Sequence, residues 1–442
     1  MFYIVEKESK LVSLENFIRR GCFVHVISSN DFYHPKLTET VAVYIRMLNS
    51  KHGYIIPIKH DDGLNVEKKR VYDILNKAQI VYTLDKKNLL YHFNIQKAID
   101  ISLAYSMTFY DKLEFNSSIS TINWYYNKFN SKKDINSLIP ITKLYEKCEL
   151  IYNSIEEYIN NIKIPEGFDF YNKLATNVFF LIEQSGLGVY YEPYNKIFKP
   201  RNPLFNSIDN KVYTSYNLYN ATSRPTNNFN SVNFAAIPHT ENHRKCFKPQ
   251  NDYFVEFDFD GYHLRLLAEQ LEYPLTKESA HKQLAESYFG TKNISEEQYK
   301  EAKQINFQAI YGKIPEKHKD LEIFKKIQKY IDTLWSTFND KGYVSNIQSG
   351  KQFTNELKEM HPAKLMNYMM QSLETSNNII ILKDVLEYLK DKKTFIALYT
   401  YDAILFDFSK EDKVEVLENI QRIMEKHEKY PVKFKYSTNL VL

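Results

Sequence analysis

The segment from Phe254 to Asp260, which reads FVEFDFD, most constrains the fold of this chain. Apolar residues alternate in it with three carboxylates, Glu256, Asp258 and Asp260. Because a β-strand points successive side chains to opposite faces, we expect the three carboxylates to share one face. A solvated strand face would explain this pattern. Divalent cations bound there would also explain it, since they offset the repulsion between carboxylates.

Two further segments carry side chains suited to chemistry. In YKEAKQINFQAIYGK, residues 299–313, Lys303, Phe307 and Tyr311 recur at every fourth position and therefore line one face of a predicted helix. A cation followed by two rings suits a triphosphate and a stacked base, although an amphipathic helix with core aromatics has the same pattern. LYTYDAILFD predicts a β-hairpin with Asp402 at its turn, where aspartate is also an ordinary turn residue.

Asp258 and Asp402 would together provide two carboxylates from separate strands. Mg²⁺ prefers one or two protein carboxylates and completes its coordination with substrate phosphate oxygens. Two such ions, about 3.5–4 Å apart, stabilise both the attacking and the leaving oxygen of an in-line phosphoryl transfer. The combination indicates phosphoryl-transfer chemistry more strongly than any one segment does.

Length, charge and cysteine usage limit the class of protein. A chain of 442 residues is expected to form two or three domains. Its net charge of +4 restricts any nucleic-acid site to a local basic surface. The three cysteines are far apart, which argues against a disulfide framework or a zinc site. No signal peptide and no apolar run of about 18 residues is present, so we expect a soluble cytoplasmic protein without a membrane partner.

The pattern of elements predicts a mixed α/β region over residues 1–110 and a helical region from about 111 to 190. Residues 191–250 are rich in Asn, Pro and Ser and are expected to be irregular. From 251 we expect a strand, helices to about 342, a hairpin, a long helix over about 362–390 and a final hairpin.

Residues 166–442 resemble a family A DNA polymerase, the class of bacterial DNA polymerase I and many phage replicases. VEFDFDGYHLRLLAEQ is similar to motif A of that family, KQINFQAIYG to motif B and TYDAILF to motif C. Weaker matches occur in the same order as in the family, namely VYTSYNLYNATSRPTN, NFAAIP, AHKQLAESYFG, KGYVSNIQSGKQF and MNYMMQS.

The resemblance implies a template-directed polymerase with primer–template DNA and dNTPs as partners. Asp258 and Asp402 would be catalytic and would bind two Mg²⁺ ions, with Mn²⁺ as an alternative and the Phe259 carbonyl as an extra ligand. The resemblance further implies that His281 and Lys303 contact the triphosphate.

The remaining site residues are also implied by the resemblance. Phe307 and Tyr311 would flank the base, with His263 also in the nucleotide pocket. The primer–template would be contacted by Arg224, Asn367, Gln371 and Tyr401, in a minor groove whose acceptor pattern is nearly degenerate.

The sequence departs from the family at several of these positions. His263 replaces a Glu that excludes ribonucleotides, so a polymerase that accepts ribonucleotides or a modified base is one alternative. Ala403 replaces a second acid of motif C, Tyr401 replaces a His and Tyr299 replaces a phosphate-binding Arg. A second alternative is therefore a weak or inactive polymerase fold that acts as a DNA-binding or scaffolding subunit of a replication complex.

The resemblance also implies a domain plan: an α+β palm over 166–270 and 362–442 with an antiparallel sheet, and helical fingers over 271–361. Residues 192–211 are too few for the helical thumb of the family. We expect a vestigial thumb, and hence either low processivity or a processivity or replisome partner that holds the DNA.

Residues 1–165 have the length and element order of the 3′–5′ exonuclease domain of the family, which is ribonuclease H-like. The first strand, VHVISSND, lacks the D-x-E metal motif, and Lys87 or Asn88 stands near the next expected acid. We expect an α/β exonuclease-like domain without its metal site, and hence no proofreading. An unrelated α/β domain is the alternative. If the polymerase is of phage or viral origin, it would act in the host cytoplasm.

Overall fold

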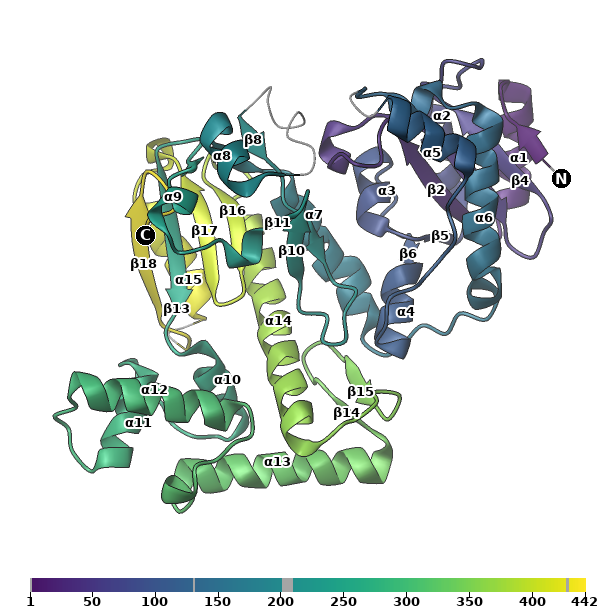
Figure 1. Ribbon diagram of the computed structural model, residues 1–442. Helices are drawn as coiled ribbons and strands as arrows, with labels where there is room; N and C mark the ends of the chain where they lie inside the picture. Colours follow the sequence, from purple (N-terminus) through teal and green to yellow (C-terminus); the bar gives the residue numbers. More distant parts are fainter. Residues whose placement is uncertain (1, 130–131, 201–209, 427–428) are drawn as a thin grey trace. The chain divides into compact units, whose positions relative to one another are not determined.

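The computed structural model describes residues 2–129, 132–200, 210–426 and 429–442. The chain forms two compact units, residues 1–180 and 181–442. Each unit buries its own apolar clusters. Both combine helices and strands, which confirms the predicted α/β and α+β multidomain class (Figure 1).

The N-terminal unit is built on a six-stranded sheet in the order β1-β4-β3-β2-β5-β6. Strands β2, β3 and β4 pair antiparallel, whereas β1–β4, β2–β5 and β5–β6 pair parallel. The central strands are almost continuously apolar because both faces of the sheet are covered. The strands are β1 Phe2–Ile4, β2 Cys22–Ser28, β3 Thr40–Met47, β4 Gly53–Pro57, β5 Val81–Thr83 and β6 Ile99–Asp100.

Helices cover this sheet with apolar stripes. Leu11 and Leu14 on the first helix and Val71 on the second belong to one core cluster, and Leu144 and Ile151 on the longest helix belong to another. These positions recur at helical spacing, as expected for helices that bury one face. The helices are α1 Glu8–Ile18, α2 Lys68–Lys77, α3 Lys86–His92, α4 Ile101–Phe109, α5 Ser120–Lys128 and α6 Ile141–Asn160. A π-helical turn at Phe170–Ala175 and α7 Thr176–Glu183 follow, and the boundary between the two units falls within α7.

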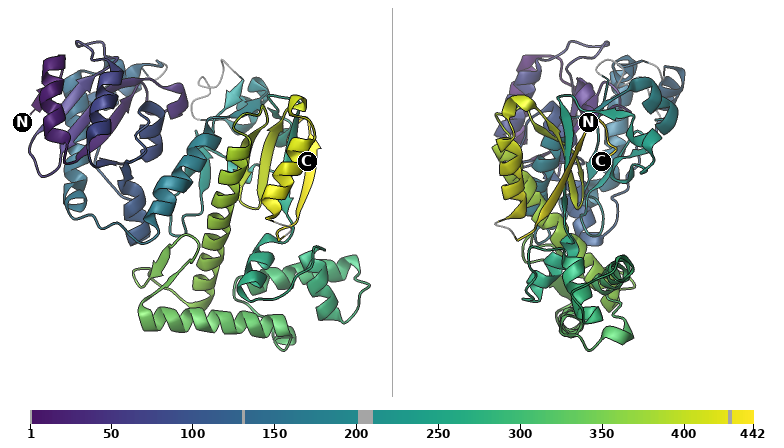
Figure 2. Two further views of the ribbon diagram at one scale, coloured as in Figure 1. Left: turned by 180° about the vertical axis from the view of Figure 1, so that it is seen from behind. Right: turned by 90° about the vertical axis from the view of Figure 1, so that its left-hand side faces the viewer.

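The C-terminal unit contains a four-stranded antiparallel sheet in the order β16-β17-β13-β18 (Figure 2). Two helices that contact each other, α14 and α15, pack with this sheet. The elements are β13 Tyr253–Phe259, α14 Pro362–Tyr388, β16 Phe395–Thr400, β17 Ala403–Phe408, α15 Glu415–Glu425 and β18 Val432–Ser437. The predicted strand at 251, long helix and final hairpin are all present.

Strand β13 ends at Phe259, which corrects the expectation that three carboxylates share one strand face. Gly261 caps the following helix in the left-handed region with φ 64°, and the backbone turns at Asp260. A left-handed residue carries little cost at glycine, so the strand stops where the glycine permits the turn. Glu256 and Asp258 share a face of the strand, and Asp260 lies in the turn beyond it.

Three helices lie in the region expected as fingers: α11 Ala280–Phe289, α12 Glu296–Ile310 and α13 Glu322–Lys341. Helix α10 Tyr262–Gln270, at the end of the range expected as palm, precedes them. Figure 1 shows the four helices below the palm sheet, with α13 across the lower end of α14. The predicted hairpin follows them as β14 Tyr343–Ser345 and β15 Gln352–Thr354. The long helix α14 therefore connects the finger helices to the palm sheet.

Residues 181–250 contain short elements that support the palm: β7 Leu187–Val189, α8 Tyr191–Phe198, β8 Lys211–Val212, β9 Tyr216–Asn217, β10 Thr226–Phe229, β11 Val232–Asn233, α9 Glu241–Arg244 and β12 Phe247–Lys248. The expected vestigial thumb, 192–211, falls in part on residues 201–209, which lie outside the described residues. Helix α8 was not expected in this polar segment. It forms because Tyr194 is buried and stacks on Phe198, and both rings meet Phe247.

Within the described ranges, the structure contains no helix that is long and apolar enough to cross a membrane.

Candidate active site

The palm sheet places Asp258 and Asp402 next to each other. Asp258 pairs with Ala403 in the β13–β17 register, and Asp402 is the second residue of the two-residue turn between β16 and β17. The Phe259 amide donates a hydrogen bond of 3.0 Å to the Asp402 carbonyl. Two segments 144 positions apart in sequence thus bring their carboxylates to one place, as the sequence predicts.

The carboxylates destabilise each other in their charged forms. Burial raises the pKa of Asp258 to about 6, with further contributions from Asp402 and Glu256. Burial also raises the pKa of Asp402, and the charge of Glu374 adds to this effect. Burial is again the main cause of the raised pKa of Glu256. A protein gains nothing in stability from such a cluster, which makes it a candidate functional site.

Lysines on β18 face these acids across the sheet. The register pairs Glu256 with Lys435 and Asp258 with Lys433. The Lys433 Nζ atom lies 3.5 Å from the Asp260 Oδ1 atom. Both lysines lower the pKa of Asp258 but do not bring it back to its ordinary value. The two lysines therefore offset the negative charge of the acids only in part.

The carboxylates of the site fit Mg²⁺ as nucleotide-binding sites usually hold this ion, with few protein ligands. Two desolvated carboxylates with raised pKa values, Asp258 and Asp402, attract a cation, and Mg²⁺ completes its shell with phosphate oxygens and water. Among the described residues, no group of three or more His, Cys, Asp or Glu side chains is arranged to hold a metal.

Helix α12 presents the cation and rings that the sequence predicts. Ser295 and Gln298 form a capping box at its N-terminus, which fixes where the helix begins. Lys303 is exposed on this helix. The Phe307 side chain is 51% exposed, an unusual state for phenylalanine, and its ring centroid lies 5.9 Å from that of Tyr311. An exposed ring beside an exposed cation is available for a ligand.

His281 reaches the same site from α11. It is buried, and its Nδ1 atom lies 3.0 Å from the Asn306 Nδ2 atom of α12. Burial and the neighbouring Lys303 lower its pKa. Asn306 is itself fully buried and joins α11 to α12 through this contact.

These side chains line one cavity of about 450 Å³. Of the predicted site residues, it is lined by Arg224, Asp258, Phe259, His263, His281, Lys303, Phe307, Tyr311 and Asp402. The cavity thus joins the palm acids to the cation and rings of the finger helices.

Three predicted primer–template residues lie outside this lining. Tyr401 stacks under Arg224, whose guanidinium carbon is 3.8 Å from the ring centroid. Gln371 accepts a hydrogen bond of 3.2 Å from the Thr222 hydroxyl and donates one of 3.0 Å to Asn367. Of the three, Tyr401 therefore contacts a residue that lines the cavity.

Glu374 and Lys433 are charged lining residues that were not predicted from the sequence. Glu374 on α14 is 1% exposed and contacts both Arg224 and His263. Lys433 comes from the last strand. The alternation in VKFKYS marks an exposed strand and could have suggested the lysine. Glu374 gave no comparable signal, because one acid within a long helix is usually solvated.

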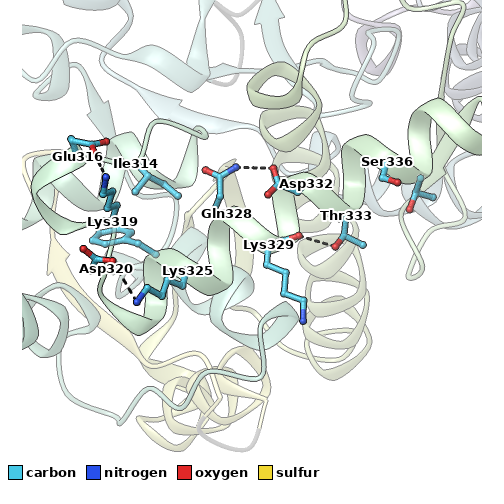
Figure 3. A pocket seen from close by; sticks show the side chains of 12 residues that line it. Ile314, Glu316, Lys319, Asp320, Lys325, Gln328, Lys329, Asp332, Thr333 and Ser336 are labelled. Carbon is cyan, nitrogen blue, oxygen red and sulfur yellow. Dashed lines mark hydrogen bonds and ion pairs between the residues drawn. The ribbon is translucent and has the colours of Figure 1, made fainter.

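A larger pocket, of about 770 Å³, lies along the outer face of α13 and contains none of the predicted site residues (Figure 3). Its charged side chains are paired locally, as in the Lys319–Glu316 contact and the Lys325–Asp320 pair at 3.5 Å. Such a surface is satisfied without a ligand, and we therefore place the functional site at the palm acids.

Comparison with known sequences agrees with this site. The sequence model of DNA polymerase family A matches residues 191–440, which is more than half of the chain and includes every predicted site residue. The chain belongs to DNA polymerase family A. It is a DNA-directed DNA polymerase. The comparison with curated proteins returned no match.

A solved structure with the same fold is the POL domain of Pol1 from M. smegmatis, in a complex with DNA primer-template and dNTP. The match has a TM-score of 0.71 and 13% sequence identity, and it covers 100% of this chain and 99% of the other. The fold is therefore shared along the whole chain, although few residues are.

Proposed function

We propose that the protein adds dNMPs to a primer 3′-OH under the direction of a template, by two-metal-ion phosphoryl transfer and without proofreading. One observation carries the proposal. Asp258 on β13 and Asp402 in the turn before the neighbouring strand β17, both with raised pKa values, line the same cavity as Lys303, Phe307 and Tyr311. The primer–template DNA and the dNTP in the structural neighbour support the same partners for this chain.

In the proposed reaction the primer 3′-oxygen forms a bond to the α-phosphorus of the dNTP. The bond from that phosphorus to the bridging oxygen breaks, pyrophosphate leaves, and the 3′-hydroxyl proton passes to solvent. Two Mg²⁺ or Mn²⁺ ions, when held by Asp258 and Asp402 with the Phe259 carbonyl, supply Lewis-acid stabilisation of both reacting oxygens. The protein itself contributes orientation and fixed charge.

The finger helices and the residues around Arg224 have separate tasks in this proposal. Lys303 and His281 contact the phosphates, where positive charge favours the developing negative charge. Phe307 and Tyr311 stack on the base. Arg224, which stacks on Tyr401, contacts the primer end together with Gln371 and Asn367.

The N-terminal unit is proposed to be a 3′–5′ exonuclease-like domain that has lost its metal site. The end of β2 supplies Asp31, whose carboxylate is held by the Lys147 Nζ atom at 2.6 Å and the Tyr126 hydroxyl at 2.9 Å. Because Lys147 already balances the charge of this carboxylate, a metal ion is not required to stabilise it. The backbone amide of Asn88, near the expected acid, donates a hydrogen bond to the Asp85 Oδ1 atom.

The short segment between α8 and β8 supports a reduced thumb. Helix α8 packs into the palm core through Tyr194, so it does not project as a clamp. We therefore propose that a processivity or replisome partner holds the DNA. A phage origin and a location in the host cytoplasm remain predictions from the sequence.

Primer extension with Mg²⁺ and dNTPs tests the function. Wild-type protein is expected to extend a primer by templated addition, and Asp258→Ala or Asp402→Ala to abolish extension. Asp332→Ala, an acid on the outer face of α13, is the matched control and should behave as wild type. No extension by wild-type protein, or equal extension by all variants, contradicts the proposal.

A DNA-binding scaffold is the second candidate, and one observation favours it: the register places Ala403, which lacks a carboxylate, directly opposite Asp258. Tight binding of primer–template in a gel-shift assay, with no nucleotide incorporation in Mg²⁺ or Mn²⁺, would support this candidate instead.

A further inference from the structure

Glu374 is not among the predicted site residues, yet it forms a charge network with two that are, Arg224 and His263. Glu374 is 1% exposed, yet its pKa is lowered: burial raises it, but the contacts with His263 and Arg224 outweigh the burial. The Arg224 Nε atom lies 2.7 Å from Oε2, and Arg224 Nη2 donates a hydrogen bond of 3.1 Å to Oε1. The His263 Nε2 atom lies 3.2 Å from Oε1.

The partners of Glu374 come from separate parts of the unit. Arg224 belongs to the loop before β10, His263 to the first turn of α10 and Glu374 to α14. Through Arg224, which stacks on Tyr401, the network also reaches the turn that carries Asp402. A single buried carboxylate thus contacts two side chains of the active-site cavity, Arg224 and His263.

His263 is one of the two partners of Glu374 that line the cavity. Its side chain is 17% exposed, and it lines the cavity together with Asp258, Asp402 and the α12 side chains. The sugar of a nucleotide connects its base to its phosphates. A nucleotide with its phosphates at Lys303 and the acids and its base at the rings therefore places its sugar against the remaining wall, to which His263 belongs.

We propose that Glu374 is a positioning residue that holds His263 against the sugar of the incoming nucleotide and so sets the preference for dNTP over rNTP. The 3.2 Å contact between the His263 Nε2 atom and the Glu374 Oε1 atom directs that edge of the imidazole toward α14 and so limits rotation of the ring. The inference rests on the proposed polymerase function, because it assigns a role within that nucleotide site.

Ternary-complex affinities measure this role without chemistry. A primer with a dideoxy end, bound to template and enzyme, is titrated with a matched dNTP and with the corresponding rNTP. Glu374→Gln keeps the shape but removes the charge, and we expect the dNTP/rNTP affinity ratio to fall by about tenfold. Glu387→Gln, an exposed acid on the same helix, is the matched control and should leave the ratio unchanged.

His263→Ala is expected to lower the ratio to the same extent, and the double variant His263→Ala/Glu374→Gln no further, because the two residues act through one contact. Purely structural damage would lower both affinities equally. Should Glu374→Gln fail to fold, Glu374→Asp retains the charge but shortens the side chain, and the same loss of ratio is expected.

An unchanged ratio in Glu374→Gln or Glu374→Asp, or additive effects in the double variant, would overturn the inference. This outcome differs from failure of the proposed function, in which wild-type protein with an unmodified primer extends nothing.

Discussion

Each unit of the chain carries an aspartate at or just beyond the end of a buried strand, and the surroundings of the two act in opposite directions. Burial raises the pKa of Asp31, but the Lys147 ion pair and the hydrogen bonds from Lys147 and Tyr126 outweigh it, so its pKa lies below the ordinary value. The pKa of Asp258 is raised to about 6 by burial, Asp402 and Glu256. The first carboxylate is paired with a cation of the chain itself, whereas the second is buried beside other acids.

The comparison gives a way to distinguish structural from functional acids in this fold. Asp407 on β17 is fully buried too, but its two oxygens accept backbone hydrogen bonds from Gln250 at 2.6 Å and Asn251 at 2.8 Å. Asp402, on the turn before the same strand, is not neutralised in this way. Burial alone therefore does not mark a catalytic acid.

The largest expected effect is that of Asp402→Asn on primer extension. We expect kcat to fall by at least about a thousandfold, since a metal-binding charge is lost at the reacting centre, while the Tm stays within a few degrees of wild type. Single-turnover incorporation and thermal unfolding measure the two quantities.

Asp407→Asn is the matched variant from the same hairpin. It should retain at least half of the activity and lose stability, by about 1–3 kcal/mol for weakened buried hydrogen bonds. If Asp402→Asn keeps its activity and Asp407→Asn loses it, the assignment of the two acids is reversed.

A smaller loss is expected for Lys303→Met, which keeps the length of the side chain without its charge. Incorporation should fall by about a hundredfold in kcat/KM, the usual size of the effect of removing one charge that acts on the transition state. Lys300→Met is the control, because Lys300 pairs with Glu296 at 2.9 Å on the exposed side of the same helix. If kcat/KM falls equally in both variants, only the net charge of α12 matters and the position of Lys303 does not.

The raised pKa of Asp258 predicts how stability depends on pH. Between the pKa of the unfolded state, about 4, and the folded value of about 6, the native state binds more protons than the unfolded state. The free energy of unfolding therefore falls as the pH rises through this window. The variant Asp258→Asn should lack this contribution to the fall in the free energy of unfolding. The Tm of the variant minus the Tm of wild type should therefore be about 2–4 °C larger at pH 7 than at pH 4.

The same site predicts how Mg²⁺ changes the Tm. It should raise the Tm of wild-type protein at pH 7, where both carboxylates are charged, and have little effect at pH 4. A Tm of Asp258→Asn that follows wild type at every pH, with or without Mg²⁺, would contradict the cation-site assignment.

Asp31→Asn is expected to have the smallest effect and to act in the other unit. Its partly exposed ion pair with Lys147 contributes roughly 1 kcal/mol, so the variant should be slightly less stable and fully active in primer extension. Exonuclease assays on a mismatched primer end should show no degradation by either protein. Degradation by wild type that is lost in the variant would mean that Asp31 is a working metal ligand.

The strands and the acids of the site follow from local patterns in the sequence. The alternation around Asp258 and the spacing of Lys303, Phe307 and Tyr311 depend on short-range geometry, and the cavity contains all four. The end of β13 could not be placed from alternation, because the strand stops where Gly261 turns the backbone.

Glu374 could not be found because its importance depends on contacts that are remote in sequence. Arg224 is 150 positions away, and nothing in α14 distinguishes a buried acid from the exposed Glu387. Helix α8 was missed for a related reason, since Tyr194 stabilises it through packing against Phe247. Tertiary contacts decide such positions, whereas periodicity does not.

Tyr401 has φ 71°, so the turn that carries Asp402 has a non-glycine residue in the left-handed region. A two-residue hairpin turn with positive φ at its first residue normally has glycine there, and tyrosine adds a local cost of about 1–2 kcal/mol. Stacking against Arg224 and a hydrogen bond of 2.7 Å from Asn378 to the Tyr401 carbonyl hold it in place. We therefore expect this hairpin to be disfavoured in the unfolded chain, and Asp402 to reach its position late in folding, once α14 has docked.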